Sequence, residues 1–329
     1  MMKNVLQSLH NHRILLRNEA KELLTKISIG EMNSSQIASF LTIYLMRKIT
    51  IEELAGFRDA LLELCIKVDL SAYDPIDLCG TGGDGKNTFN ISTLASFIVA
   101  GADVKVAKHG NYGVSSMSGS SNVMEKLGYQ FTNDLAKIEI QIEKTNICFL
   151  HAPLFHPAMK LVAPIRKELG IKTFFNMLGP MVNPAKPNKQ IVGVYSLELL
   201  RLYKYLYQQS DKKFTILYSL DGYDEISLTS DFRLISNTED SLKSPEDYFS
   251  KQLKQAQLFG GNSVEESARI FTKILSGEGT EAQNSVVIAN AATAIQVATG
   301  NSLEDSFASA KESLASGNAL ISLKKLISI

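Results

Sequence analysis

The sequence lacks several features that mark broad classes of protein. It has only 3 cysteines, Cys65, Cys79 and Cys148, without Cys-x-x-Cys or Cys/His spacing, so neither a disulfide framework nor a zinc site is indicated. No apolar run is long enough to span a bilayer, and no basic segment followed by an apolar core stands at the start. We therefore expect a cytoplasmic protein with reduced thiols.

Net charge is also lacking. The 34 Lys and Arg residues balance the 34 Asp and Glu residues among 329 positions, so no overall field attracts nucleic acid or an anionic membrane. With 8 prolines, 21 glycines and 45% hydrophobic residues, the composition is globular rather than disordered or fibrous. The length allows about two domains. Any anion that the chain binds must be held by local groups.

Two patterns divide the chain. Up to about residue 72, apolar residues recur at helical spacing, with an N-cap at Asn33 and a capping-box pattern starting at Thr50. Beyond it, short apolar runs alternate with Gly-rich turns and helical stretches, which is typical of α/β domains. The predicted strands are 76–79, 104–107, 147–150, 191–195 and 214–218. Helices are predicted at 94–100, 123–127 and 156–169, with a buried Ala-rich helix around 286–295.

The first predicted strand runs into a Gly-rich loop, GTGGDGKNTFNIST over residues 80–93, which leads into a helix. A strand, a Gly-rich loop and a helix N-terminus together form an anion site from backbone N–H groups and the helix dipole. The loop partly fits a dinucleotide fingerprint, and it partly fits a P-loop in which Asn87 replaces the required Ser or Thr. A tight turn without a ligand would explain Gly82 and Gly83, but not the polar residues at the helix start.

Two further segments carry candidate ligand groups. A second donor-rich loop, residues 108–122, follows the next strand. Since the carboxyl ends of parallel strands meet in one crevice, we expect the two loops to hold two phosphate groups of one ligand. Asp224 and Glu225 follow the strand at 214–218, and adjacent carboxylates suit Mg²⁺, with an ordinary solvated acidic turn as the alternative.

These motifs resemble those of the anthranilate phosphoribosyltransferase family. The matching segments occur in the family's order over most of the chain: 80–84, 90–93, 108–111, 118–120, 156–159, 175–180 and 224–225. The resemblance implies an α/β fold of the class II nucleoside phosphorylase type, with a small helical N-terminal domain and a large α/β domain around a central mixed sheet. We expect the helical domain over 1–72, with a return segment near 165–185, and the α/β domain over 73–164 and 186–329. The resemblance also implies a homodimer formed through the helical domain.

The reaction implied by the resemblance transfers the phosphoribosyl group of 5-phosphoribosyl 1-diphosphate to the amine of anthranilate and releases pyrophosphate, in tryptophan biosynthesis. The implied cofactor is Mg²⁺, two ions per subunit, held by Ser92, Asp224 and Glu225. Anthranilate is expected at Gly80, Asn111 and Arg166. The residues expected to bind 5-phosphoribosyl 1-diphosphate are Gly80, Gly83, Asp84, Thr88, Asn90, Ile91, Ser92, Thr93, Lys108, His109, Gly110, Asn111, Tyr112, Gly113, Val114, Ser115, Ser116 and Ser120.

Catalysis in such a site needs donors and Mg²⁺ around a leaving polyanion rather than a nucleophile. Lys108 and Asn90 are expected to stabilise the transition state, and neither His109 nor His156 is assigned as acid or base. The partners are therefore small-molecule substrates, without nucleic acid or membrane.

The second loop departs from the family pattern at several positions, among them Ser121 and Asn122, which replace a common Ala-Asp. Tyr112 stands where relatives commonly carry Arg, and Met117 where they often carry a basic residue; Lys86 is the candidate replacement cation. Two other functions stay open. One is a pyrimidine nucleoside phosphorylase, which shares the fold but is normally longer, and the other is a catalytically idle relative that binds nucleic acid, against which the zero net charge argues.

Overall fold

The computed structural model describes residues 2–113, 117–248 and 251–329. The chain forms two compact units, one of Met1–Lys67 with Ala152–Pro184 and one of Val68–His151 with Ala185–Ile329. These boundaries differ from the expected ones, because residues 152–164 belong with the helical unit instead of the α/β unit. The physical reason is local: the chain leaves the sheet at His151, and the carbonyl oxygen of Phe155 already accepts the Ile66 N–H at 2.8 Å.

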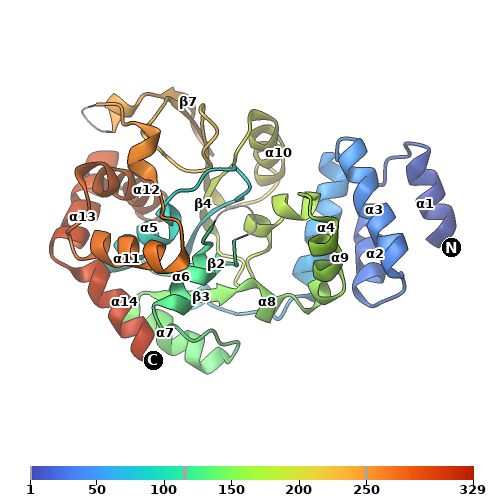
Figure 1. The fold of residues 1–329 in the computed structure, drawn as a ribbon, viewed down its shortest axis with the longest axis horizontal. Coiled ribbons are helices and arrows are strands. Elements are labelled where there is room, and N and C mark those ends of the chain that lie inside the picture. Colours follow the sequence, from blue (N-terminus) through green and yellow to red (C-terminus); the bar gives the residue numbers. More distant parts are fainter. Residues whose placement is uncertain (1, 114–116, 249–250) are drawn as a thin grey trace. The chain divides into compact units, whose positions relative to one another are not determined.

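Helices make up the first unit (Figure 1). Asn33 and Thr50 begin their helices with capping boxes, as predicted. The rings of Phe57 and Phe174 stack with centroids 4.7 Å apart, and Phe40 meets both edge-on, so the returning segment shares the core of the N-terminal helices. The α-helices are α1 (Met2–His10), α2 (Arg17–Ser28), α3 (Ser34–Met46), α4 (Ile51–Leu64), α8 (Ala152–Phe155) and α9 (Val162–Leu169), with 3₁₀ turns at Pro157–Lys160, Phe174–Met177 and Gly179–Val182.

The second unit is built on a seven-stranded mixed sheet with strand order β3-β2-β1-β4-β5-β6-β7. The first five strands along the chain pair in parallel, and the last two pair antiparallel. The strands are β1 (Ile76–Gly80), β2 (Val106–Gly110), β3 (Ile147–His151), β4 (Lys189–Gly193), β5 (Lys213–Ser219), β6 (Phe232–Ser236) and β7 (Asp240–Lys243). The expected class, a helical N-terminal domain with an α/β domain around a mixed sheet, is confirmed.

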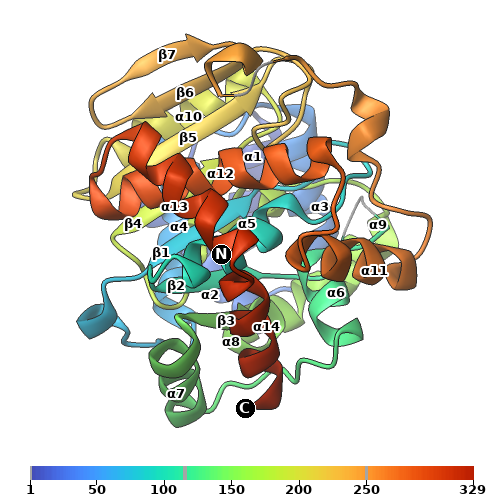
Figure 2. The same cartoon turned by 90° about the vertical axis from the view of Figure 1, so that its left-hand side faces the viewer.

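Helices cover both faces of this sheet, with α5, α12 and α13 on one side and α10 on the other (Figures 1 and 2). Leu78 and Ile191 point into the apolar core beneath α12, whose alanines allow close packing. The helices of this unit are α5 (Ile91–Gly101), α6 (Ser120–Lys126), α7 (Leu135–Thr145), α10 (Leu197–Tyr207), α11 (Val264–Leu275), α12 (Glu281–Thr299), α13 (Leu303–Ala315) and α14 (Asn318–Ser328), with 3₁₀ turns at Ser71–Tyr73, Pro245–Asp247 and Gln255–Leu258.

Three secondary-structure predictions need correction. Strand β2 begins at Val106 rather than at residue 104, since the Val104 N–H still bonds back to Val99 at the end of α5. Strands β6 and β7 were not predicted; they are short, and β7 lacks a buried face. The segment 156–169 is a 3₁₀ turn followed by a helix instead of one helix. No helix within the described residues combines the length and the apolar character needed to cross a membrane.

Candidate active site

The first loop leaves the sheet at Gly80, the last residue of β1. The Thr81 N–H donates to the Gly193 carbonyl oxygen at 2.9 Å, which holds the start of the loop against the end of β4. Gly82 and Gly83 have φ angles of 65° and 80°, a left-handed conformation that only glycine adopts without strain. The loop therefore depends on these glycines to turn back toward α5.

The far end of the first loop is tied to two other segments. Thr88 forms an isolated antiparallel bridge with Phe259, and the Asn90 side-chain amide donates to the Ser118 carbonyl oxygen at 2.9 Å. Asn90 thus links the two loops that were predicted to converge. The side chains of Ile91 and Thr93 are buried, so these two predicted ligand residues face the core and leave only their backbone for a ligand.

The acidic pair lies against the first loop. The Asp224 carboxylate accepts the Gly82 N–H at 2.7 Å, and the Glu225 carboxylate accepts the Ser92 N–H at 2.8 Å. The Asp84 carboxyl group is within hydrogen-bonding reach of Asp224. The structure therefore brings together Ser92, Asp224 and Glu225, the three residues predicted to hold the metal.

Burial and mutual repulsion dominate the electrostatics of these acids. Burial, with the negative charge of Asp84, raises the pKa of Asp224 above its ordinary value. Burial, with the charge of Asp224, raises the pKa of Glu225 in the same way. Two glycines make this arrangement possible, because a Cβ atom on Gly80 would overlap the Asp224 carboxylate and one on Gly193 would overlap the Asp224 carbonyl oxygen. The carboxyl groups of Asp84, Asp224 and Glu225 therefore gather at this end of the sheet.

Lys108 lies within strand β2 instead of in the second loop, where the sequence analysis placed it. It is 2% exposed, and its ammonium group donates to the Leu78 carbonyl oxygen at 2.6 Å. Burial lowers the pKa of Lys108, and the nearby charge of Asp77 opposes this effect. Its positive charge therefore acts on the acidic cluster from within the sheet. His109 and Gly110 share this strand with it.

The second loop is closed by one side chain that was not predicted. The Asn122 amide oxygen accepts the Gly113 N–H at 2.9 Å and the Gly119 N–H at 3.0 Å, so it joins the two ends of the loop. The Ser120 hydroxyl donates to the Asn111 carbonyl oxygen at 3.2 Å. The predicted ligand residues Val114, Ser115 and Ser116 lie outside the described residues.

The positions that depart from the family pattern have different surroundings. The Tyr112 ring meets the His151 ring edge-on at 4.9 Å, while Met117 is 56% exposed. His151 is buried, accepts or donates a hydrogen bond with Ser121 at 2.9 Å, and has its pKa lowered by burial to about 4, so it is neutral at pH 7. The Lys86 ammonium lies 4.6 Å from the centre of the ring of Tyr223, the residue before Asp224 in the chain.

Arg166, on α9, belongs to the first unit, whereas Gly80 and Asn111 belong to the second. Its Nη2 donates to the Asn176 side-chain oxygen at 3.1 Å, and its guanidinium lies 5.3 Å from the centre of the Phe175 ring. Burial lowers its pKa. Its Nε is buried without a hydrogen-bond partner among the described residues. A buried guanidinium with a free donor and no carboxylate partner there is suited to bind an anionic ligand.

Comparison with known proteins agrees with this geometry. Residues 72–320 match the model of the glycosyl transferase family a/b domain, and residues 3–65 match that of the family's helical bundle domain. The anthranilate phosphoribosyltransferase of Flavobacterium psychrophilum is 64% identical over 327 residues, covering 99% of this chain and 98% of that protein. This chain belongs to the anthranilate phosphoribosyltransferase family.

Solved structures of the anthranilate phosphoribosyltransferase family have the same fold. The crystal structure of the Thermus thermophilus enzyme superposes with a TM-score of 0.91 at 32% identity and covers 98% of both chains. The Saccharomyces cerevisiae enzyme, in complex with 5-phosphoribosyl 1-diphosphate and Mg, has a TM-score of 0.91 at 28% identity and covers 99% of this chain and 97% of that one. The family expected from the sequence motifs is confirmed, and a pyrimidine nucleoside phosphorylase is not favoured.

The donor set fits Mg²⁺ shared with a phosphorylated ligand. The side chains of the described residues do not bring three or more His, Cys, Asp or Glu groups together in metal-binding geometry. Mg²⁺ is commonly held by one or two carboxylates, with substrate phosphates and water as its remaining ligands. Asp224 and Glu225 supply two such carboxylates, side by side at the end of the first loop.

Proposed function

We propose that this protein transfers the phosphoribosyl group of 5-phosphoribosyl 1-diphosphate to the amine of anthranilate, with release of pyrophosphate. The observation that carries the proposal is the convergence, at the carboxyl ends of β1 and β5, of a Gly-rich donor loop and a buried pair of acids. A polyphosphate with bound Mg²⁺ matches both the N–H donors and the uncompensated carboxylates. Membership of the family supplies the acceptor, anthranilate.

The residues of the chain bind and orient the donor substrate. The predicted set consists of Gly80, Gly83, Asp84, Thr88 and Asn90 to Thr93 in the first loop, residues 108–110 in β2, and Asn111 to Ser116 with Ser120 in the second loop. We expect backbone N–H groups of the loops other than those of Gly82 and Ser92 to donate to the phosphates, and Asn90 links the two loops. Mg²⁺, when bound by Ser92, Asp224 and Glu225, neutralises charge on the departing pyrophosphate. We expect two ions per subunit, which titration calorimetry would count.

The transition state is stabilised by charged and polar groups around the leaving pyrophosphate. As the bond at C1 of the ribose breaks, positive charge develops on the sugar and negative charge on pyrophosphate. Lys108 contributes positive charge from inside the sheet, and Asn90 fixes the donor loops, so both act on the leaving group without transferring a proton. The amine of anthranilate is neutral at pH 7, and we assign no general base, which leaves His109 and His156 without a proton-transfer role.

Arg166 binds the anthranilate carboxylate in this proposal, with Gly80 and Asn111 as further contacts. Its support is the buried Nε, which has no hydrogen-bond partner among the described residues. Asn176 positions the guanidinium by accepting from Nη2. The planar group offers a bidentate contact that a carboxylate matches.

One assay tests the function. Anthranilate fluorescence should fall when the protein is mixed with anthranilate, 5-phosphoribosyl 1-diphosphate and Mg²⁺, and it should stay constant when any of these is omitted. Phosphorolysis of thymidine under the same conditions would instead indicate a nucleoside phosphorylase. Salt-dependent DNA binding without transferase activity would indicate a nucleic-acid-binding relative.

We also propose a homodimer formed through the first unit. The helical unit exposes large apolar side chains, including Leu16 at 68%, Ile29 at 62% and Met46 at 82%. A subunit contact that covered these side chains would remove them from water, which is favourable. Light scattering should give twice the chain mass, and Leu16→Glu with Met46→Glu should shift the measured mass toward that of one chain.

We also propose that the protein is cytoplasmic, because Cys65, Cys79 and Cys148 are all free thiols.

A further inference from the structure

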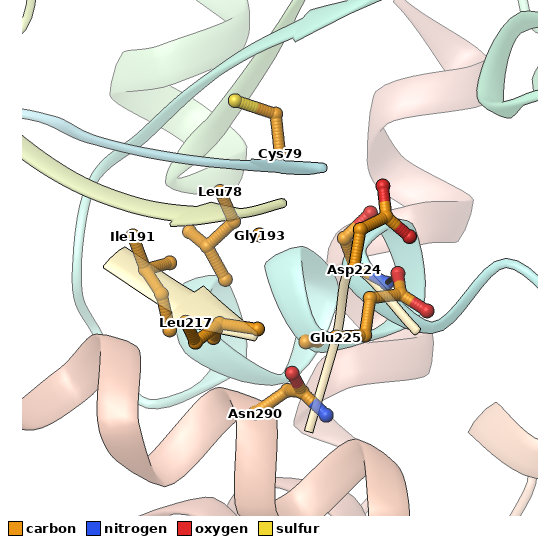
Figure 3. Close-up of a pocket in the computed structure, with 10 residues that line it drawn as sticks. Leu78, Cys79, Ile191, Gly193, Leu217, Asp224, Glu225 and Asn290 are labelled. Carbon is orange, nitrogen blue, oxygen red and sulfur yellow. Dashed lines mark hydrogen bonds between the residues drawn. The ribbon is translucent and has the colours of Figure 1, made fainter. Parts of the chain in front are cut away.

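Two buried side chains form hydrogen bonds to a single peptide group in the turn that carries Asp224 and Glu225. The Ser219 hydroxyl, at the end of β5, donates to the Glu225 carbonyl oxygen at 2.6 Å. The Asn290 side-chain oxygen, from α12, accepts the N–H of Ile226, which is the other half of the same peptide, at 3.1 Å. Figure 3 shows Asn290 next to the turn that carries the two acids. The plane of this peptide is thereby fixed from two different elements.

The hydrogen bonds of Asn290 leave none of its groups unused. Its amide nitrogen donates to the carbonyl oxygens of Ile226 and Val286, both at 2.9 Å. The residue is 5% exposed, in a helix whose other buried residues are mostly apolar. Burying an amide there is unfavourable unless every group is paired, and an apolar residue would pack at this position without that requirement. The position of Asn290 is therefore explained by the turn that it holds rather than by the helix.

The turn is also held from other sides. The Gly82 and Ser92 N–H groups donate to its two carboxylates, and Asp224 packs so closely against Gly80 and Gly193 that neither has room for a Cβ atom. The hydrogen bonds of Ser219 and Asn290 differ from these contacts because they fix a backbone peptide of the turn itself, the one between Glu225 and Ile226.

We propose that Asn290 and Ser219 are positioning residues that hold the Asp224–Glu225 turn in place to bind Mg²⁺ together with a diphosphate. The proposal rests on the proposed function, since it assumes that these acids bind the metal. Neither residue touches the substrate in this role. Each acts through the peptide bond between Glu225 and Ile226.

The test compares Asn290→Leu and Ser219→Ala with a matched control, Thr293→Val. Thr293 is buried on the same helix and donates to the Ala289 carbonyl oxygen at 2.9 Å, so its replacement also removes a buried hydrogen bond but leaves the turn alone. Binding of Mn²⁺ in the presence of pyrophosphate is measured by electron paramagnetic resonance. Initial rates are measured against Mg²⁺ and against anthranilate.

Asn290→Leu and Ser219→Ala should each bind Mn²⁺ at least about tenfold more weakly than the parent, as is usual when a residue that orients metal ligands is lost. The Mg²⁺ concentration for half-maximal rate should rise, with the KM for anthranilate unchanged. Thr293→Val should bind Mn²⁺ like the parent.

If Asn290→Leu and Ser219→Ala fold and bind Mn²⁺ as tightly as the parent, the proposal is wrong. It is also wrong if Thr293→Val loses as much Mn²⁺ affinity as they do. If Asn290→Leu does not fold, Ser219→Ala decides alone, because it removes a single oxygen atom. If the parent protein binds Mn²⁺ with pyrophosphate but does not consume anthranilate, the proposed function is wrong. The positioning role of Asn290 and Ser219 would still hold.

Discussion

The Ser92 N–H, in the first turn of α5, donates to the Glu225 carboxylate at 2.8 Å. The sequence alone predicts that this helix N-terminus binds the anion of a ligand. In the structure, a carboxylate of the chain itself takes one of its donors, and Asp224 takes another N–H from the first loop at Gly82. The first loop and the acidic turn therefore form one unit, and the ligand that completes it must bring positive as well as negative charge, as a Mg²⁺-bound diphosphate does.

Replacing Asp224 by Asn and Glu225 by Gln together should separate function from stability. The amide oxygens can still accept from Gly82 and Ser92, but two like charges disappear. We expect the rate to fall and to require more Mg²⁺. The metal-free protein should become more stable at pH 8, and each kcal/mol of relieved repulsion would raise the Tm by about 2–4 °C. Asp231→Asn, at an exposed acid, is the control, and a lower rate with an unchanged Mg²⁺ dependence would contradict the metal assignment.

Gly193→Ala should damage the same turn from the side of the sheet. A Cβ atom at this position would overlap the Asp224 carbonyl oxygen, so either β4 or the acidic turn has to move. We expect a large loss of activity, at least about tenfold. Gly179→Ala is the matched control, because a Cβ there meets nothing within 4 Å. Circular dichroism shows whether the sheet is retained, and an active Gly193→Ala enzyme would mean that the turn can move freely.

The parts of the fold that could be predicted are those with local signals. The caps at Asn33 and Thr50 and the apolar runs of β1 and β3 carry their information within a few neighbouring residues. β6 and β7 could not be found in this way, because short antiparallel edge strands with exposed polar residues resemble loops.

Much of the site was visible for the same reason, since Gly-rich and acidic loops are local patterns. The residues that hold those loops were not visible. Asn290 contacts a turn 64 positions earlier in the chain, and Gly193 matters only because Asp224 lies against it. Lys108 was read as a loop residue because strand register, which places it inside the sheet, depends on the pairing of β2 with β3. A glycine in the middle of the predicted strand 191–195 is a signal that could have pointed to Gly193, because a glycine inside a strand often marks close approach of another backbone.

Arg166→Ala should weaken the apparent affinity for anthranilate by about tenfold or more, since losing one partner of a buried charge pair costs roughly 2–5 kcal/mol. Arg166→Lys should recover little, because an ammonium group lacks the planar donor pair. The KM for 5-phosphoribosyl 1-diphosphate should change less. Lys167→Ala, an exposed cation on the same helix, should behave like the parent. An unchanged KM for anthranilate in Arg166→Ala would remove this residue from the site.

Lys86→Ala should raise the KM for 5-phosphoribosyl 1-diphosphate if Lys86 replaces the cations missing at Tyr112 and Met117. The ammonium group lies over the Tyr223 ring, next to the acidic turn, which places its charge near the expected diphosphate. Tyr112→Arg in the same protein should partly reverse the rise. Lys213→Ala removes an equal charge at the opposite end of the sheet, where β5 begins, and should have no effect. If Lys86→Ala has an unchanged KM for 5-phosphoribosyl 1-diphosphate and unchanged salt sensitivity, Lys86 does not replace the missing cations. The backbone amides and Lys108 would then be sufficient to bind the phosphates.

Glu53→Gln should destabilise the first unit. The Glu53 carboxylate is fully buried, and it accepts from Arg47 at 2.9 Å, from the Tyr44 hydroxyl at 2.9 Å and from the Leu15 N–H at 3.1 Å. Breaking such a buried ion pair costs about 3–5 kcal/mol, because Arg47 is left without its charge partner. Thermal unfolding at pH 7 measures the loss, and Glu52→Gln, at the exposed neighbouring acid, is the control.

The same residue predicts a pH dependence. Burial alone would raise the pKa of Glu53, but the hydrogen bonds from Arg47, Leu15, Thr50 and Tyr44 outweigh it and lower the pKa below its ordinary value. A carboxyl whose folded pKa lies below the unfolded value of about 4.3 adds stability above that pH, and the contribution is lost as the pH falls through the folded pKa. The parent should therefore lose stability more steeply than Glu53→Gln between about pH 5 and pH 3. Parallel stability curves for the two proteins over this range would show that Glu53 does not supply this pH dependence.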